Sequence, residues 1–310
     1  MPQNRNQSTP PIGRRPDARR RWYLRIPLKL LIFAGIAFAV LYPHPARLAR
    51  HLHRLRQLDA VIDPDAPHVA ALETMLLEWA AATDPEMNLD QLRSDSHRAQ
   101  RLVERFIYEK VQYAWDWELW GVVDYFPSIE EIFEKAGDGP LREDCDGRAL
   151  LAASLMRRFG FEATLAADLR HMWVETPQGA FMSPGETKTI AFDEHGSHIS
   201  YGTLLANLPS SLTFGIAVFP LMREMILLLA AWVLMLDRRT TPARAILGLM
   251  LLVQGLLFLR LSYPVSRGAA VEMIAWSAWV GLLHIAAGFV VLLRPAPTPT
   301  AARPLREAWR

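Results

Sequence analysis

The sequence predicts an α+β domain, with an antiparallel sheet and a central helix that carries a cysteine, attached to about four transmembrane helices. Two observations support this fold class. Long apolar stretches flank a polar segment at residues 57–212. Within that segment, helix-like patterns come first and strand-like patterns follow. Helices and strands that are segregated along a chain are typical of α+β folds with antiparallel strands.

The apolar stretches cover residues 26–42, 214–236, 245–261 and 269–293. A spanning helix needs roughly 17–25 apolar residues, so the first and third stretches are at the short end. The predicted organisation is a basic disordered tail at 1–25, one span at 26–42, a domain at 57–212, three spans within 214–293 and a tail at 294–310. Alternatively, the first stretch is a signal peptide cleaved near Ala37-Phe38-Ala39. Both interpretations export the domain.

The basic residues predict the orientation in the membrane. Arginines are frequent in the N-terminal tail, in the loop after residue 236 and in the C-terminal tail. Four spans place these three segments on one side, which the positive-inside rule makes cytoplasmic. Four arginines directly after the first stretch favour the opposite orientation; they are Arg47, Arg50, Arg54 and Arg56. We expect the tails inside and the domain outside. The alanine- and arginine-rich composition is typical of bacteria and predicts the inner membrane.

Charge is distributed unevenly along the chain. Residues 57–212 contain 27 Asp+Glu against 12 Lys+Arg, whereas the flanks contain 22 basic and 5 acidic residues. An acidic domain repels phosphate, so nucleic acid is excluded as its partner. The expected partners are the lipid bilayer, a peptide or protein substrate and other envelope proteins.

Helix signals fill the first part of the domain. Apolar periodicity predicts a helix over 66–82, and Asp95 or Ser96 can cap a second helix that runs to about Tyr113. Ser128 and Glu131 form a capping box for a third helix. A fourth helix over 145–159 is apolar on more than one side, which predicts a buried position, and Gly160 ends it.

Strand signals follow the fourth helix. Residues 161–169, 171–176 and 180–183 have β-like patterns, and a turn at Pro177-Gln178-Gly179 separates the last two. Residues 187–192 are a possible further strand. The hairpin places His171 opposite residues near 183–185.

Cys145 is the only cysteine of the chain, and it stands at the start of the predicted buried helix. The helix dipole favours a thiolate at such a position. His171 begins a separate strand, and a histidine on another element is the usual base for a cysteine nucleophile. The pair predicts a hydrolase or acyl-transferase that forms a thioester. The backbone N–H of Cys145 is then the first oxyanion donor. The second is one of four aromatic residues, namely Tyr113, Trp115, Trp117 and Trp120.

Three segments in order carry a resemblance to a known family. They are Asp144-Cys145-Asp146-Gly147-Arg148-Ala149-Leu150, Leu155-Met156-Arg157-Arg158-Phe159-Gly160-Phe161-Glu162-Ala163 and His171-Met172-Trp173-Val174-Glu175. Over about residues 113–184, the chain resembles the transglutaminase-like superfamily, whose fold is related to papain-like cysteine proteases. The resemblance implies Cys145 as nucleophile and His171 as base.

The third catalytic member departs from the family pattern. The resemblance implies an aspartate just before a proline on the next strand, but this chain has Ser183 before Pro184. The Ser183 hydroxyl can orient the imidazole without supplying a charge, and Asp193 is the alternative. Asp144 and Asp146 are expected to cap the helix, and no cofactor or metal is predicted. The other functional hypothesis is an inactive descendant that serves as a binding or scaffold module.

Overall fold

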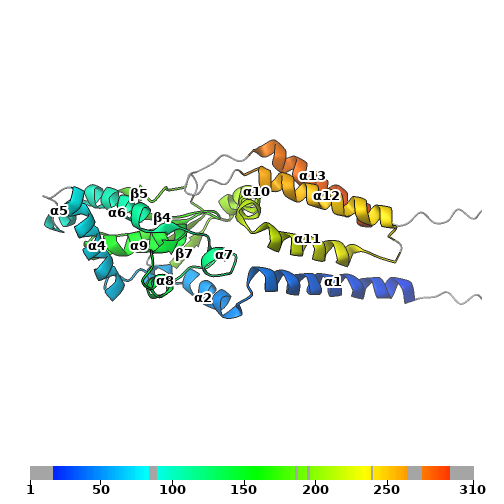
Figure 1. The fold of residues 1–310 in the computed structure, drawn as a ribbon, viewed down its shortest axis with the longest axis horizontal. Coiled ribbons are helices and arrows are strands. Elements are labelled where there is room, and N and C mark those ends of the chain that lie inside the picture. The colour runs from blue at the N-terminus through cyan, green and yellow to red at the C-terminus, as the bar shows by residue number, and fades with distance from the viewer. Residues whose placement is uncertain are drawn as a thin grey trace, which may run out of the picture.

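The computed structural model describes residues 17–83, 89–185, 188–193, 196–238, 240–263 and 274–293. The strands and short helices gather at one end, and the long helices run side by side away from them (Figure 1). Those long helices are α1 (Asp17–Leu41), α11 (Leu221–Met235), α12 (Pro242–Leu261) and α13 (Ala275–Leu293). The architecture therefore mixes helices with a sheet and adds a helical bundle, as the sequence predicts.

A five-stranded sheet forms one layer of the domain. Its order is β5-β4-β3-β6-β7, and all neighbouring strands are antiparallel, which confirms the predicted strand direction. The strands are β3 (Thr164–Ala167), β4 (Met172–Thr176), β5 (Gly179–Phe181), β6 (Ile190–Asp193) and β7 (Gly196–Ile199). Strand β7, which contains His198, is absent from the sequence prediction.

Helix α9 (Cys145–Arg158) is the centre of the core, because every residue from Gly147 to Met156 is buried. It packs on β4 and on the surrounding helices α4 (Pro67–Thr83), α6 (Ser96–Lys110) and α8 (Ile129–Ala136). After α9, Gly160 adopts a φ of 92°, which a residue with a side chain rarely takes. The predicted central helix and its glycine end are both confirmed.

The predicted caps fix two helix starts. Asp95 accepts the N–H of Arg98 at 3.0 Å, and Ser128 and Glu131 form both bonds of the capping box. Helix α6 ends at Lys110, earlier than predicted, because the next residues form β1 (Gln112–Tyr113). This strand pairs in parallel with β2 (Arg142–Glu143), directly before α9.

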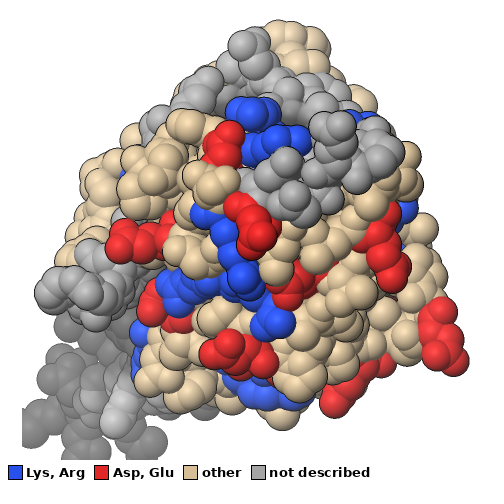
Figure 2. Space-filling view, turned by 90° about the vertical axis from the view of Figure 1, so that its left-hand side faces the viewer, with Lys and Arg blue, Asp and Glu red and all other residues tan. Residues whose placement is uncertain are grey.

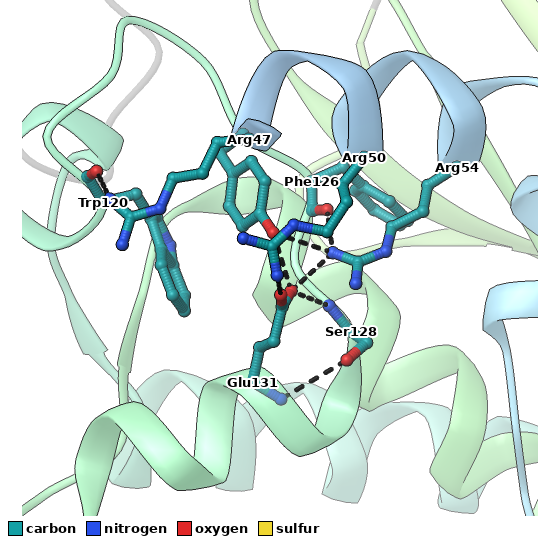
Figure 3. A network of polar contacts seen from close by, with 8 residues as sticks. Arg47, Arg50, Arg54, Trp120, Phe126, Ser128 and Glu131 are labelled. Atoms are coloured by element: carbon teal, nitrogen blue, oxygen red, sulfur yellow. Dashed lines mark hydrogen bonds and ion pairs between the residues drawn. The ribbon is translucent and has the colours of Figure 1, made fainter. Parts of the chain in front are cut away.

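Helix α2 (Pro45–Leu55) joins the first long helix to the domain. It follows α1 after a bend of 81°, and its arginines point into the domain (Figure 3). Arg50 lies 2.6 Å from Glu131, Arg54 pairs with the same carboxylate, and Arg47 donates to the carbonyl oxygen of Trp120. The short helices α3 (Leu58–Val61), α5 (Leu89–Ser94) and α7 (Asp116–Leu119) complete the domain.

Two to four helices of the described chain could span a membrane. Helices α12 and α13 are long and apolar enough, and two bent pairs count only if each pair is one span. The predicted span at 214–236 is broken by a 114° bend between α10 (Tyr201–Val218) and α11. Pro220 has no N–H and confines Phe219 to an extended conformation, so the helix stops there. Residues 17–25, predicted as part of a disordered tail, lie in α1.

The domain and the bundle meet at this α10–α11 corner. Trp117 donates its indole N–H to Val218 O at 3.1 Å, and Arg223 donates to Gly121 O at 3.0 Å. Glu224 pairs with Arg260 of α12 at 2.6 Å. Arg223 therefore connects the bundle to the domain, and Glu224 connects two helices within the bundle.

Candidate functional site

Cys145 is the first residue of α9 and is half-buried. The preceding residue, Asp144, is the N-cap, and its Oδ1 accepts the N–H of Asp146 at 3.0 Å. The capping role predicted for Asp144 is confirmed. A cysteine at this position has its backbone N–H among the groups that an α-helix leaves without an internal partner.

The surroundings of Cys145 favour the thiol over the thiolate. Burial raises its pKa well above the ordinary value, and the carboxylates of Asp146 and Asp144 raise it further. The sulfur donates to Asp146 Oδ1 at 3.4 Å. The backbone N–H of Met172 lies at the sulfur and opposes the rise. Burial and two adjacent acids therefore outweigh the helix dipole, which alone would favour the thiolate.

His171 lies directly before β4, at the end of a tight turn. Asp168 Oδ1 accepts the N–H groups of Arg170 and His171 at 2.6 and 2.8 Å, and Asp168 N donates to His171 O at 2.9 Å. These bonds fix the backbone of His171. Since the next residue, Met172, presents its N–H to the sulfur, the turn places His171 beside Cys145.

The imidazole of His171 is oriented by a backbone carbonyl. Its Nε2 lies 2.9 Å from Met182 O, and a carbonyl can only accept a hydrogen bond. This contact assigns the hydrogen of the neutral ring to Nε2 and leaves Nδ1 as the basic nitrogen. Among the described residues, the side-chain hydrogen bond of the sulfur goes to Asp146, and none joins Cys145 to His171.

Ser183 does not take the orienting position that the sequence predicts for it. Its hydroxyl lies 2.8 Å from the hydroxyl of Tyr108 on α6. The cause is the backbone, since Met182 and Ser183 have φ values of 67° and 56°, a conformation uncommon for residues with side chains. The chain therefore leaves β5 at Phe181, aims the Met182 carbonyl at His171, and carries Ser183 to α6.

Asp193 is also excluded as the orienting group. It lies on β6, which pairs with β3 and not with β4. The register sets Ala167 opposite both Met172 and Ile190, so Asp193 lies further along, toward the Thr164 end of β3. His171 lies at the other end of these strands.

Two tyrosines lie within electrostatic reach of the Cys145 sulfur. Burial raises the pKa of Tyr113, and the nearby Cys145 raises it further. Tyr108 has a pKa raised by burial, with a smaller contribution from Cys145. The Arg148 guanidinium lies over both rings, 5.5 Å from Tyr108 and 5.1 Å from Tyr113. Trp117 was another candidate oxyanion donor, but its N–H is used by Val218 O.

Buried carboxylates form a cluster that the sequence analysis missed. Oxygens of Asp116, Glu143 and Asp144 lie within 4.8 Å of one another, as do ligand atoms of Asp144, Cys145 and Asp146. Burial raises the pKa of Asp144 to about 7, and it raises those of Asp116 and Glu143 well above their ordinary values. Such oxygen sets suit either a hard divalent cation or shared protons.

The missed residues have a simple explanation. Asp116 and Glu143 are far apart in the sequence, and the parallel β1–β2 pair brings their segments together.

Comparison with models of protein families, with curated proteins and with solved structures finds no match to this chain.

Proposed function

We propose that this protein is a membrane-anchored, transglutaminase-like cysteine hydrolase or acyl-transferase that acts on peptide or isopeptide amides. One observation carries the proposal. The first amide of β4 lies at the Cys145 sulfur, and the adjacent His171 is held by Met182 O with Nδ1 as its basic nitrogen. A half-buried thiol, a base directly before the adjacent strand and a group that fixes the base are the parts needed for nucleophilic catalysis.

The chemistry follows from these atoms. His171 Nδ1 takes the thiol proton as the sulfur attacks the amide carbon, and the imidazolium then protonates the leaving amine. The C–N bond breaks and a thioester remains on Cys145. Attack by water gives hydrolysis, and attack by another amine gives acyl transfer. The Cys145 N–H, at the start of α9, is placed to donate to the oxyanion.

The raised pKa of Cys145 shapes this scheme. Because burial and two carboxylates keep the sulfur protonated, His171 acts as a base during attack and does not hold a preformed thiolate. The Met182 carbonyl fixes the ring but supplies no full negative charge to the imidazolium. We therefore infer a slower nucleophile than one with a carboxylate partner.

Replacing His171 with alanine tests the proposal. We expect the rate of Cys145 alkylation by iodoacetamide at pH 7.5 to fall at least about tenfold, a smaller loss than the roughly 10²–10⁴-fold that a general base contributes to catalysis. Since Cys145 is the only cysteine, the labelled protein reports one site. His198→Ala is the matched control, because His198 is exposed on β7. Equal rates for His171→Ala and the unmodified protein would reject the base role.

A second candidate function is a binding or scaffold module without catalysis. The hydrogen bond from the sulfur to Asp146 favours it, since that bond competes with transfer of the thiol proton to His171. The alkylation experiment separates the two functions, because a scaffold needs no pairing of Cys145 with His171.

We further propose that the domain lies on the extracytoplasmic face of a bacterial inner membrane, where other envelope proteins are its expected partners. The arginines after the first span favoured the reverse orientation from sequence alone. In the structure, Arg50 and Arg54 are paired with the Glu131 carboxylate of α8, so part of this positive charge is already balanced within the protein. The basic residues of the two tails and of the loop after α11 support a cytoplasmic location for these segments.

Single-cysteine labelling tests this orientation. In a Cys145→Ser background, we expect Glu130→Cys on α8 to react with a membrane-impermeant maleimide in intact cells. Arg238→Cys, in the loop after α11, is expected to react only after the membrane is opened. Both positions are exposed, so access to the reagent is matched. The reverse pattern would place the domain in the cytoplasm.

A further inference from the structure

Helix α10 has an apolar stripe on its outer side and no charged residue along its 18 residues. The stripe is made by four large side chains that are 52–71% exposed, namely Tyr201, Leu205, Leu208 and Leu212. Their spacings of four, three and four residues place them on one face of a helix. Helix α10 therefore presents a continuous apolar surface to its surroundings.

The polarity of α10 is the reverse of that of a helix in water. Its exposed residues are all apolar apart from the hydroxyl of Tyr201. The hydroxyl and amide side chains of the helix are half-buried or buried; they are Thr203, Asn207, Ser210, Ser211 and Thr213. Some of them bond within the helix, since Ser210 donates to Asn207 O at 2.9 Å and Thr213 donates to Ser210 O at 2.8 Å. A helix on a water-facing surface turns its polar side outward instead.

Helix α6 shows the ordinary pattern in the same protein. Its residues Val103 and Phe106 are buried, whereas Arg101, Arg105 and Glu109 are exposed. Figure 2 shows the end of the domain that lies away from the long helices, where Lys, Arg, Asp and Glu side chains spread across the face. The lack of charge on α10 is therefore not a general property of the domain surface, and it indicates a different environment.

Helix α10 is fixed at one end of α12, a helix long and apolar enough to cross a membrane. Arg260, in the last turn of α12, donates to Ile216 O at 3.0 Å and to Phe219 O at 2.7 Å. The Phe214 and Tyr263 rings lie 5.1 Å apart. The 20 residues of α12 extend about 30 Å, the thickness of the hydrocarbon core of a bilayer. The contacts therefore hold α10 at the level where such a span leaves the hydrocarbon.

The direction of α10 fits the surface of a membrane. The chain turns by 114° between α10 and α11. In Figure 1, α10 is seen nearly end-on, whereas the long helices beside it are seen lengthwise. Helix α10 therefore lies across the bundle, and the surface of a membrane spanned by the bundle would run along it. Helices with an apolar outer face occupy the boundary between headgroups and acyl chains, where tyrosine is also enriched.

We propose that α10 is an interfacial helix whose apolar stripe inserts into the lipid leaflet on the domain side of the membrane. Lipid fits the stripe because the stripe adjoins the bundle and lacks the polar rim of a surface that binds a protein. The inference goes beyond the proposed function, because it does not depend on any chemistry at Cys145.

Quenching of a fluorophore by spin-labelled lipid tests the insertion. In a Cys145→Ser background, Leu205→Cys and Leu208→Cys are each labelled with a nitrobenzoxadiazole fluorophore. The full-length proteins are reconstituted into vesicles of phosphatidylcholine and phosphatidylglycerol that contain a lipid with a doxyl group near its headgroup. We expect both labels to be quenched at least about twofold more than the label of Ser210→Cys, because an interfacial helix buries its apolar face about 5–10 Å into the headgroup and acyl boundary.

Three control positions define the scale. Ser210 is half-buried on the opposite side of α10, and Arg101→Cys on α6 should remain unquenched in water. Met250→Cys, at a position 55% exposed in the middle of α12, should be quenched most by a doxyl group near the end of the acyl chain. Thermal melts check that every variant folds.

Three results would overturn the proposal. The first is quenching of Leu205→Cys and Leu208→Cys as weak as that of Arg101→Cys, which would place the stripe in water. The second is a blue-shifted emission at both positions without quenching, which would show that a second copy or another protein covers the stripe. The third is an unquenched Met250→Cys, because α12 would then not lie in lipid.

Discussion

Replacing Gly147 with alanine is expected to destabilise the domain by about 1–3 kcal/mol, the usual cost of overpacking a core. A methyl group at this position would lie 2.6 Å from Cγ and 2.7 Å from Oε2 of Glu143. Glu143 is fully buried beneath the first turn of α9 and cannot move aside freely. Alanine usually stabilises a helix relative to glycine, so the expected sign is the reverse of the ordinary one.

A double-mutant cycle tests the cause. Removing the Glu143 side chain in Glu143→Ala/Gly147→Ala should recover most of the lost stability, because no atom then blocks the methyl group. The measurement is the melting temperature in detergent, followed by tryptophan fluorescence. Gly215→Ala in α10 is the matched control, since a methyl group there meets nothing within 4 Å. A Gly147→Ala protein as stable as the unmodified one would contradict the packing of β2 against α9.

Glu143→Gln is expected to stabilise the protein at pH 8 by about 1–3 kcal/mol, the cost of a buried polar group without a partner. Both carboxylate oxygens of Glu143 are buried, and neither has a hydrogen-bond partner in the part of the chain that the structure describes. Burial and the adjacent Asp144 and Asp146 raise its pKa well above the ordinary value. Glutamine is uncharged, and its amide can donate to Asp116 Oδ1, which also lacks a partner.

The stability advantage of Glu143→Gln is expected to depend on pH, and the direction follows from the raised pKa of Glu143. The native state keeps the Glu143 proton to higher pH than the unfolded state, so unfolding releases a proton above the ordinary glutamate pKa of about 4.3. The free energy of unfolding therefore falls as pH rises toward the raised pKa. The advantage of Glu143→Gln should grow between pH 5 and pH 8, as measured by melting temperature. Glu130→Gln on the exposed side of α8 serves as control, and an advantage independent of pH would argue against a protonated Glu143.

Local signals predicted much of the fold. Asp95, Ser128 and Gly160 fix helix ends through contacts within a few residues, so their effect can be derived from sequence. The apolar residues on more than one side of the helix at 145–159 indicated a buried position for the same reason. Pro220 indicated that a helix ends near it, but residues 214–236 were predicted as one span because of the length of the apolar stretch.

The site was less predictable because it depends on backbone conformation and distant pairing. Cys145 and His171 could be selected by type and spacing. The orienting carbonyl of Met182 could not, because two successive positive φ values at residues with side chains leave no sequence pattern. The cluster of Asp116 with Glu143 likewise depends on β1–β2, a pair of two-residue strands with no periodicity to detect.

The corner between α10 and α11 has a further consequence, since the domain is joined to the bundle at both of its ends. Chain enters through α1 and α2, leaves through α10, and is bonded to α11 by the contact of Arg223 with Gly121. If the bundle spans a membrane and the domain acts as proposed, attachment at both ends restrains the domain from tumbling and keeps Cys145 at a nearly constant height above the lipid. The enzyme and a membrane-bound substrate would then meet by diffusion in the plane of the membrane. The distance between the substrate amide and the bilayer surface would decide which amides reach Cys145.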